Sequence, residues 1–65
     1  MDGYRRVAVV NGAEYDMENT DETVFLNEGL VPSFPDLRGA AITSQVDNER
    51  REVRFYFTKR AGEKG

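Results

Sequence analysis

The chain contains no cysteine, no histidine and no tryptophan among its 65 residues. Without cysteine neither a disulfide nor a thiolate zinc site can form, and without histidine the imidazole metal sites are excluded as well. Histidine is also the usual base in nucleophilic catalysis, so hydroxyl groups such as those of Ser33 and Ser44 have no imidazole to activate them. We therefore predict a protein that is not an enzyme and that holds no metal and no cofactor.

Long apolar runs are also missing. The first ten residues include only a four-residue apolar run, Val7 to Val10, which is far shorter than the core of a signal peptide. No other stretch approaches the length that is needed to cross a bilayer. These absences predict a cytoplasmic protein that makes no membrane contact.

The short length limits the core that the chain can build. A domain of this size buries only about 60% of the surface that its unfolded chain exposes, so its stability is marginal. Disulfides and metal sites built from cysteine or histidine are excluded here, which leaves association with another chain as the remaining source of stability. We expect a single domain over residues 1–59, a flexible tail over residues 60–65, and a homodimer or an assembly with a protein partner.

Residues 4–17 have the pattern of a β-hairpin. Asn11-Gly12 lies between two runs of strand-forming residues, and Asn-Gly is the pair that a two-residue type I′ turn favours. Such a turn pairs Val10 with Ala13, and every second residue then shares a face. The face expected to be buried contains Ala8, Val10, Ala13, Tyr15 and Met17, while Val7 and Val9 lie on the other face among charged residues.

The pattern of residues 19–28 predicts a short helix. Asn19 or Thr20 can cap its first turn, and Glu22 follows Asn19 at the spacing of a capping box. Gly29 supplies a residue suited to the left-handed conformation that ends many helices. We expect this helix to be stable only because it packs on the rest of the domain.

Residues 31–38 are expected to be irregular, because Val31 and Phe34 each precede a proline, which favours extended geometry. Phe34 is either a plug over the edge of the core or an exposed anchor for a partner. If Val7 and Val9 are exposed together with Phe34, they form an apolar patch that an association interface would cover. These three residues are therefore the interface candidates.

Residues 40–58 predict a second hairpin. A loop at residues 47–50 places Ile42 opposite Phe55, and a shorter loop at Asp47-Asn48 shifts the pairing by an even number without changing the faces. The buried face then contains Ala40, Ile42, Val53, Phe55 and Phe57. The outer face contains Thr43, Gln45, Glu52, Arg54, Tyr56 and Thr58.

The expected order of elements is strand, strand, helix, strand, strand. This order predicts an α+β fold in which two hairpins form a small antiparallel or mixed sheet packed on one short helix. The same ββαββ order occurs in β-grasp folds. The likeness concerns the order of elements only, and a fold does not by itself imply a function.

Lysine and arginine are absent from residues 13–36, which contain seven carboxylates. A partner-facing role for this segment and an ordinary solvated surface both fit the pattern. A partner-facing segment predicts a small acidic module that binds a basic surface, such as a phage or mobile-element inhibitor of a nucleic-acid-handling protein. The candidate protein-binding residues are Glu14, Asp16, Glu18, Asp21, Glu22 and Glu28.

Two other interpretations stay open. A basic aromatic strand follows the acidic segment, and it could bind nucleic acid or a small anion through Arg50, Arg51, Arg54, Tyr56, Lys59 and Arg60. A formal net charge of −3 works against phosphate binding, and Arg54 could instead pair with Glu52 or with acidic residues of the helix segment. Thirdly, the chain could be a structural subunit that lends a sheet edge to a larger assembly.

Overall fold

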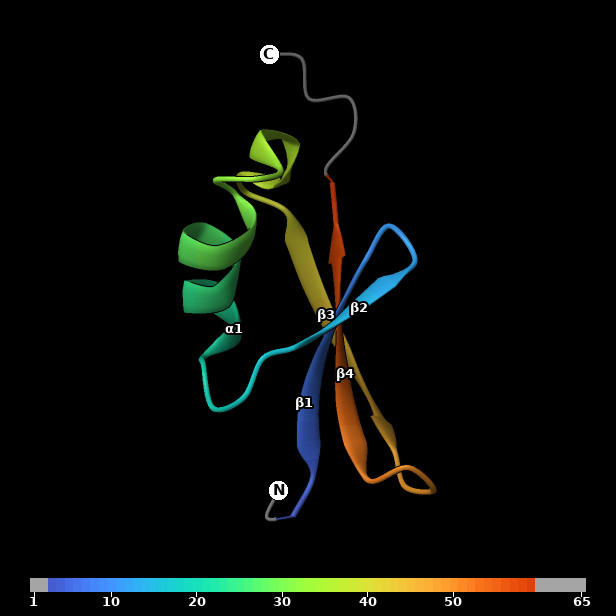
Figure 1. The fold of residues 1–65 in the computed structure, drawn as a ribbon. Coiled ribbons are helices and arrows are strands. Elements are labelled where there is room, and N and C mark those ends of the chain that lie inside the picture. Colours follow the sequence, from blue (N-terminus) through green and yellow to red (C-terminus); the bar gives the residue numbers. More distant parts are fainter. Residues whose placement is uncertain (1–2, 60–65) are drawn as a thin grey trace.

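Four strands form one mixed sheet, and a single helical segment packs on one of its faces (Figure 1). A computed structural model describes residues 3–59 of the chain. The elements are β1 (Arg5–Val10), β2 (Ala13–Asp16), α1 (Glu22–Val24), η1 (Phe25–Leu30), η2 (Pro35–Leu37), β3 (Ala41–Asp47) and β4 (Glu52–Thr58). The tail that we predicted over residues 60–65 lies outside the described residues.

The strands lie in the order β2-β1-β4-β3, with β1 and β4 side by side at the centre. β1 pairs with β4 in parallel, whereas β2 pairs with β1 and β3 pairs with β4 in antiparallel fashion. The parallel pair requires a long crossover, and the helical segment supplies it. The structure confirms the α+β class with a mixed sheet, and its strand order is compatible with the β-grasp-like pattern.

The first hairpin has the predicted turn and register. Asn11 and Gly12 have φ angles of 52° and 83°, the positive values that a type I′ turn needs. Val10 pairs with Ala13 and Ala8 pairs with Tyr15. The Asn-Gly signal was therefore sufficient to place every pair of this ribbon.

The burial that we predicted for this hairpin is only partly correct. Ala8, Val10 and Met17 are buried, but Ala13 is exposed and Tyr15 keeps 39% of its surface exposed. β2 lies at the edge of the sheet, so its side chains have a neighbouring strand on one side only. That position explains why two residues of the predicted core face remain in contact with solvent.

The helix begins later than predicted. Asp21 is the N-cap, and its carboxylate accepts hydrogen bonds from the backbone N–H groups of Thr23 at 2.9 Å and Val24 at 3.4 Å. Asn19 and Thr20 do not cap it, because the N–H of Thr20 donates to the carbonyl of Met17 and closes a turn after β2. The chain has to complete that turn before the helix can begin.

The helix also ends later than predicted. Gly29 was expected to end it, but the helix continues through Gly29 to Leu30 as the wide turn η1, in which the N–H of Val31 donates to the carbonyl of Leu26. This extension buries Leu26 and Leu30 to 4% and 3% exposure. Packing of these leucines on the sheet outweighs the local preference of glycine for a helix end.

The N-cap assignment gives a first testable prediction. Asp21→Ala should lower the free energy of unfolding by about 1 kcal/mol, because the first helical N–H groups lose their acceptor. Asn19→Ala is the matched control and should change stability by less than about 0.5 kcal/mol, as expected for an exposed position with no such bond. Urea unfolding followed by circular dichroism measures both, and an equal loss in the two variants would contradict the assignment.

The segment after the helix contains one regular turn that we did not predict. η2 is a 3₁₀ turn, and the N–H of Leu37 donates to the carbonyl of Phe34 at 2.9 Å. Leu37 is buried, and Phe34 is half-buried against the core. Phe34 therefore lies as the plug interpretation requires.

The second hairpin has the predicted faces but a different register. Ile42 pairs with Phe57 instead of Phe55, and the loop occupies residues 48–51. The carboxylate of Asp47 accepts hydrogen bonds from the N–H groups of Glu49 and Arg50, at 3.0 and 3.1 Å. These bonds build the turn beyond Asp47, so the strand keeps Asp47 and the pairing shifts by two residues. An even shift preserves the faces.

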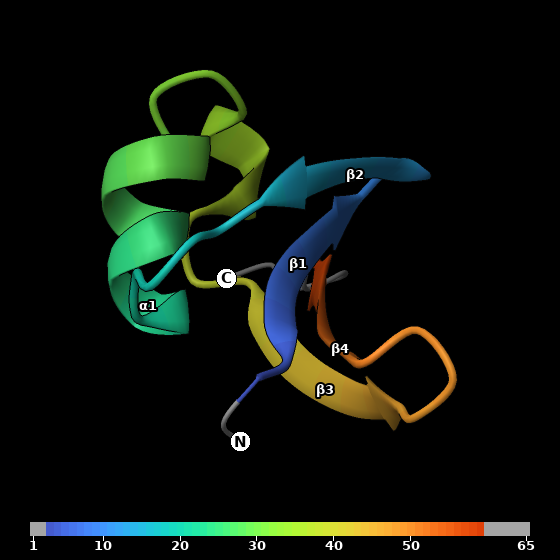
Figure 2. The same cartoon turned by 60° about the horizontal axis from the view of Figure 1, so that its bottom comes forward.

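The core lies between the helical segment and one half of the sheet. Figure 1 and Figure 2 show the helix over the half near the β1–β2 turn, while the β3–β4 loop extends away from it. Arg6 links the sheet to the start of the helix at the edge of this core, since its guanidinium lies 4.8 Å from the centre of the Phe55 ring and donates to Glu22 at 2.9 Å. The buried core residues are Ala8, Val10, Met17, Leu26, Leu30, Leu37, Ala40, Phe55 and Phe57.

Candidate functional site

The sheet face opposite the helix carries a connected set of charged side chains. Arg5 donates to one carboxylate oxygen of Glu52, and Arg54 donates to the other at 3.1 Å. Arg54 also donates to Glu14, which reaches across from β2. We call Arg5, Glu14, Glu52 and Arg54 the outer-face ion network.

Glu52 is the centre of this network and is only 3% exposed. Glu52 lies on the outer face that the alternation predicts, and there the two arginines bury it. The hydrogen bond from Arg5 holds the pKa of Glu52 below its usual value, although burial acts in the opposite direction. The hydrogen bond to Glu14, followed by the contact with Tyr56, raises the pKa of Arg54. Arg5, Glu52 and Arg54 therefore stay charged at neutral pH.

Sequence reasoning did not find this arrangement as a whole. It identified Glu52 as one partner of Arg54, but it gave no role to Arg5. Arg5 reaches Glu52 because β1 pairs in parallel with β4, and the register places these two residues side by side. No local pattern predicts a pairing between strands that are more than forty residues apart, so the sequence held no signal for it.

The candidate anion-binding residues do not converge on one surface. Arg54 is bound to two carboxylates, and its Nε donates to the hydroxyl of Tyr56 at 3.2 Å. Arg50 and Arg51 lie in the β3–β4 loop, whereas Lys59 lies beyond the other end of β4 and pairs with Asp36 at 3.6 Å. Arg60 lies outside the described residues.

The acidic candidates are only partly neutralised. Glu14 pairs with Arg54 and Glu22 pairs with Arg6. Asp16 accepts the backbone N–H of Glu18 at 2.8 Å, and Asp21 caps the helix. Of the six acidic candidates, four are exposed and form no ion pair within residues 3–59, and these are Asp16, Glu18, Asp21 and Glu28.

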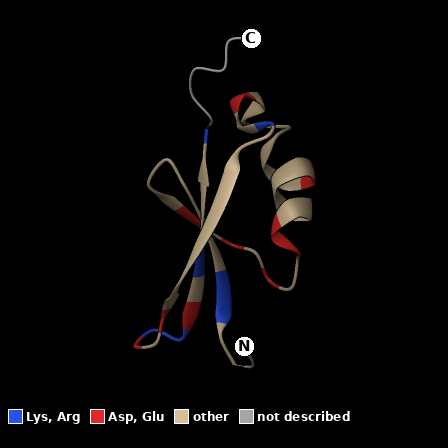
Figure 3. Cartoon of the chain, turned by 180° about the vertical axis from the view of Figure 1, so that it is seen from behind, with Lys and Arg blue, Asp and Glu red and all other residues tan. Residues whose placement is uncertain are grey.

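Three of these four carboxylates cluster along one segment. We call residues 14–22 the acidic connection, since they run from β2 to the start of the helix. Figure 3 shows acidic positions along this path with no basic position between them. Glu28 lies further along, on η1. The arrangement provides a short, exposed, negatively charged ridge instead of one flat acidic face.

The three interface candidates lie in different places. Val7 is 3% exposed on the outer sheet face, beside Asp16 and Arg54 in the strand register. Val9 is half-buried on the same face, and Phe34 packs against the core on the opposite side of the sheet. They do not form one apolar patch, so an association surface has to be sought elsewhere.

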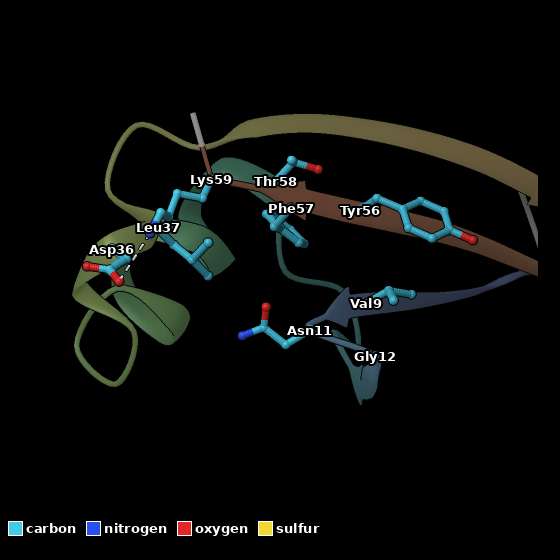
Figure 4. A pocket seen from close by; sticks show the side chains of 9 residues that line it. All are labelled: Val9, Asn11, Gly12, Asp36, Leu37, Tyr56, Phe57, Thr58 and Lys59. Atoms are coloured by element: carbon cyan, nitrogen blue, oxygen red, sulfur yellow. Dashed lines mark ion pairs between the residues drawn. The ribbon is translucent and has the colours of Figure 1, made fainter. Parts of the chain in front are cut away.

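An open groove of about 520 Å³ lies between the β1–β2 turn, the end of β4 and η2 (Figure 4). Val9 and Tyr56 line one part of it, and the ion pair of Asp36 with Lys59 crosses the other. Its two charged groups neutralise each other.

Two further properties concern the described part of the chain. Within residues 3–59, no group of three or more carboxylates is arranged to hold a metal ion. No helix in this range has the length and apolar character that would be needed to span a bilayer. The chain matches no family model, and neither a curated protein nor a solved structure resembles it closely enough to count as a match.

Proposed function

We propose that this chain is a non-enzymatic protein-binding module that docks on a basic surface of its partner through the acidic connection. The observation that carries the proposal is that Asp16, Glu18 and Asp21 are exposed and form no ion pair within residues 3–59. Surface charges of one sign attract a partner of the opposite sign and raise its rate of association. Four of the seven basic side chains within residues 3–59, by contrast, form ion pairs with carboxylates of the same chain, and these are Arg5, Arg6, Arg54 and Lys59.

The class of partner follows from the same charge pattern. Proteins that handle nucleic acid expose basic surfaces, and a ridge of carboxylates can occupy such a surface in place of phosphates. An acidic inhibitor of the phage or mobile-element type, acting in the cytoplasm, fits this description. Inhibition then requires no chemistry from the chain itself.

The principal alternative is binding of nucleic acid or another anion by the basic strand. Arg54 is the residue on which that alternative depends most, and its charge is already compensated by Glu14 and Glu52. Arg50 and Arg51 remain exposed in the β3–β4 loop, where the guanidinium of Arg51 lies 5.8 Å from the centre of the Tyr4 ring. One aromatic ring that is already stacked on an arginine falls short of the several rings that hold single-stranded nucleic acid. The geometry therefore favours the acidic connection.

Charge reversal at matched positions tests the proposal. Glu18→Lys and Glu49→Lys change the net charge equally, and both positions are exposed, but only Glu18 lies in the acidic connection. Binding of a fluorescent oligolysine peptide is measured by anisotropy at low and high salt. We expect Glu18→Lys to weaken binding about tenfold, a loss of about 1.4 kcal/mol, and Glu49→Lys to have less effect.

The same assay decides between the interpretations. Equal weakening by the two variants would show that only net charge matters and would contradict a defined acidic site. Binding of a single-stranded oligonucleotide that is lost on replacing Arg50 and Arg51 would favour the anion-binding alternative. High salt should weaken oligolysine binding, because exposed charges are screened.

A further inference from the structure

The two edges of the sheet differ in how they are protected. β2 is a short strand with exposed side chains, two of them acidic, and these features discourage pairing with another strand. β3 has seven residues, contains no lysine, arginine, proline or glycine, and has a single charge at its end, Asp47. Four consecutive residues of β3, from Thr43 to Val46, are exposed. β3 therefore presents an unprotected edge.

The backbone bonds show which groups of β3 point outward. The N–H of Arg5 donates to the carbonyl of Arg51. Backbone groups point to alternate sides along a strand, so the N–H and C=O groups of residues 53, 55 and 57 of β4, like that carbonyl, point toward β1. Residues 52, 54, 56 and 58 of β4 must then face β3, where their partners are Asp47, Gln45, Thr43 and Ala41. The backbone N–H and C=O groups of Ile42, Ser44 and Val46 are left pointing away from the sheet.

We infer that the β3 edge is the site where a second copy of this chain docks, by antiparallel pairing of β3 with β3 about a twofold axis through Ser44. In this register Ser44 lies opposite the partner's Ser44, and Ile42 lies opposite the partner's Val46. The outward N–H and C=O groups of Ile42, Ser44 and Val46 can then all form hydrogen bonds with the same groups of the second copy. Registers shifted by two residues in either direction leave some of them unpaired.

The side chains of β3 are complementary to a copy of themselves in this register. Val46 is one of the large apolar residues that the chain leaves exposed, at 47%. It would meet the partner's Ile42 on the helix-bearing face, and such apolar pairs stabilise neighbouring strands. Asp47 would face the partner's Ala41, so no two carboxylates are placed opposite each other. A β3 strand with lysine or glutamate at these positions would place charged side chains opposite apolar ones or opposite one another.

The same pairing places the two helical segments on one face of an eight-stranded sheet, as an isologous twofold contact requires. The helix covers the half of the sheet that contains Ile42, whereas Val46 lies toward the uncovered end. Because the two β3 strands run antiparallel, the helix of each copy lies beside the uncovered half of the other sheet. This surface is separate from the acidic connection, which adjoins the β2 edge.

Molar mass measured by light scattering over a dilution series tests the inference. We expect a dimer that dissociates on dilution, and we expect Val46→Lys to raise its dissociation constant by about tenfold or more. Tyr15→Lys is the matched control, since Tyr15 is 39% exposed on β2, at the opposite edge of the sheet from β3. Circular dichroism verifies that both variants stay folded. A dimer that both substitutions weaken equally would overturn the inference.

Two substitutions at the twofold axis test the register. Ser44→Pro removes an N–H that points outward, so it should abolish the dimer without breaking a bond inside the sheet. Ser44→Cys should form a disulfide-linked dimer on mild oxidation, because the natural chain has no cysteine and the paired Cα atoms would lie within bonding range. Thr43→Cys is the control and should cross-link far more slowly. A chain that is monomeric at every concentration contradicts the proposal and leaves the edge to a strand of a different protein.

Discussion

Replacing Phe55 by alanine should remove a large part of the free energy of unfolding of this domain. Phe55 is 6% exposed in the middle of β4 and supports the guanidinium of Arg6 on its ring. Loss of a buried phenylalanine side chain costs about 3–5 kcal/mol. A chain of this length has a total stability of roughly 3–10 kcal/mol, so the loss removes a large part of it.

The control for this prediction is Tyr15→Ala. Tyr15 is also an aromatic residue on a strand, but it lies on β2 and is 39% exposed. We expect its loss to cost about 1 kcal/mol or less, as is usual for a largely exposed position. Thermal unfolding followed by circular dichroism compares the two variants. A Phe55→Ala variant as stable as Tyr15→Ala would show that the core is not built around β4.

The second large effect is expected at Glu52. Glu52→Gln keeps the shape of the side chain but leaves the guanidinium groups of Arg5 and Arg54 without their shared carboxylate. The side chain of Arg5 is 63% exposed, so water can solvate its charge, but that of Arg54 is only 17% exposed and would lose one of its two carboxylate partners in a largely buried position. We expect the melting temperature at neutral pH to fall by several degrees or more. Glu14→Gln, the control, should have a smaller effect because that carboxylate is half-exposed and binds Arg54 alone.

The pH dependence of stability provides an independent test of Glu52. Its pKa is lowered in the folded chain, chiefly by the hydrogen bond from Arg5. The stabilisation is therefore complete above the unfolded value, near pH 4.5, and is lost as the pH falls through the lower folded value. Wild-type stability should decrease on acidification through this range, and the Glu52→Gln curve should be flatter there. Parallel curves for the two proteins would show that Glu52 is not the group that titrates.

Particular short patterns determined much of this fold. Asn11-Gly12 placed the first turn and its register, because the required positive φ angles are available to few other residue pairs. Period-two alternation over residues 40–58 assigned Phe55 and Phe57 to the buried face, and that assignment survived a register shift of two residues. The order of elements gave the α+β class. These features depend on neighbouring residues, which a sequence displays directly.

Other features required contacts between distant parts of the chain. The boundaries of the helix changed because the turn after Met17 and the packing of Leu30 overrode the local signals at Asn19 and Gly29.

The outer-face ion network and the two sheet edges also depend on contacts between distant parts of the chain. The parallel pairing of β1 with β4 places Arg5 beside Glu52, a carboxylate that alternation assigns to the outer face and that is buried there. That pairing also left β3 at an open edge and β2 at a short acidic one. Alternation along one strand decides which face a side chain occupies, but only the tertiary structure decides what covers that face, since the covering groups come from strands that are remote in sequence.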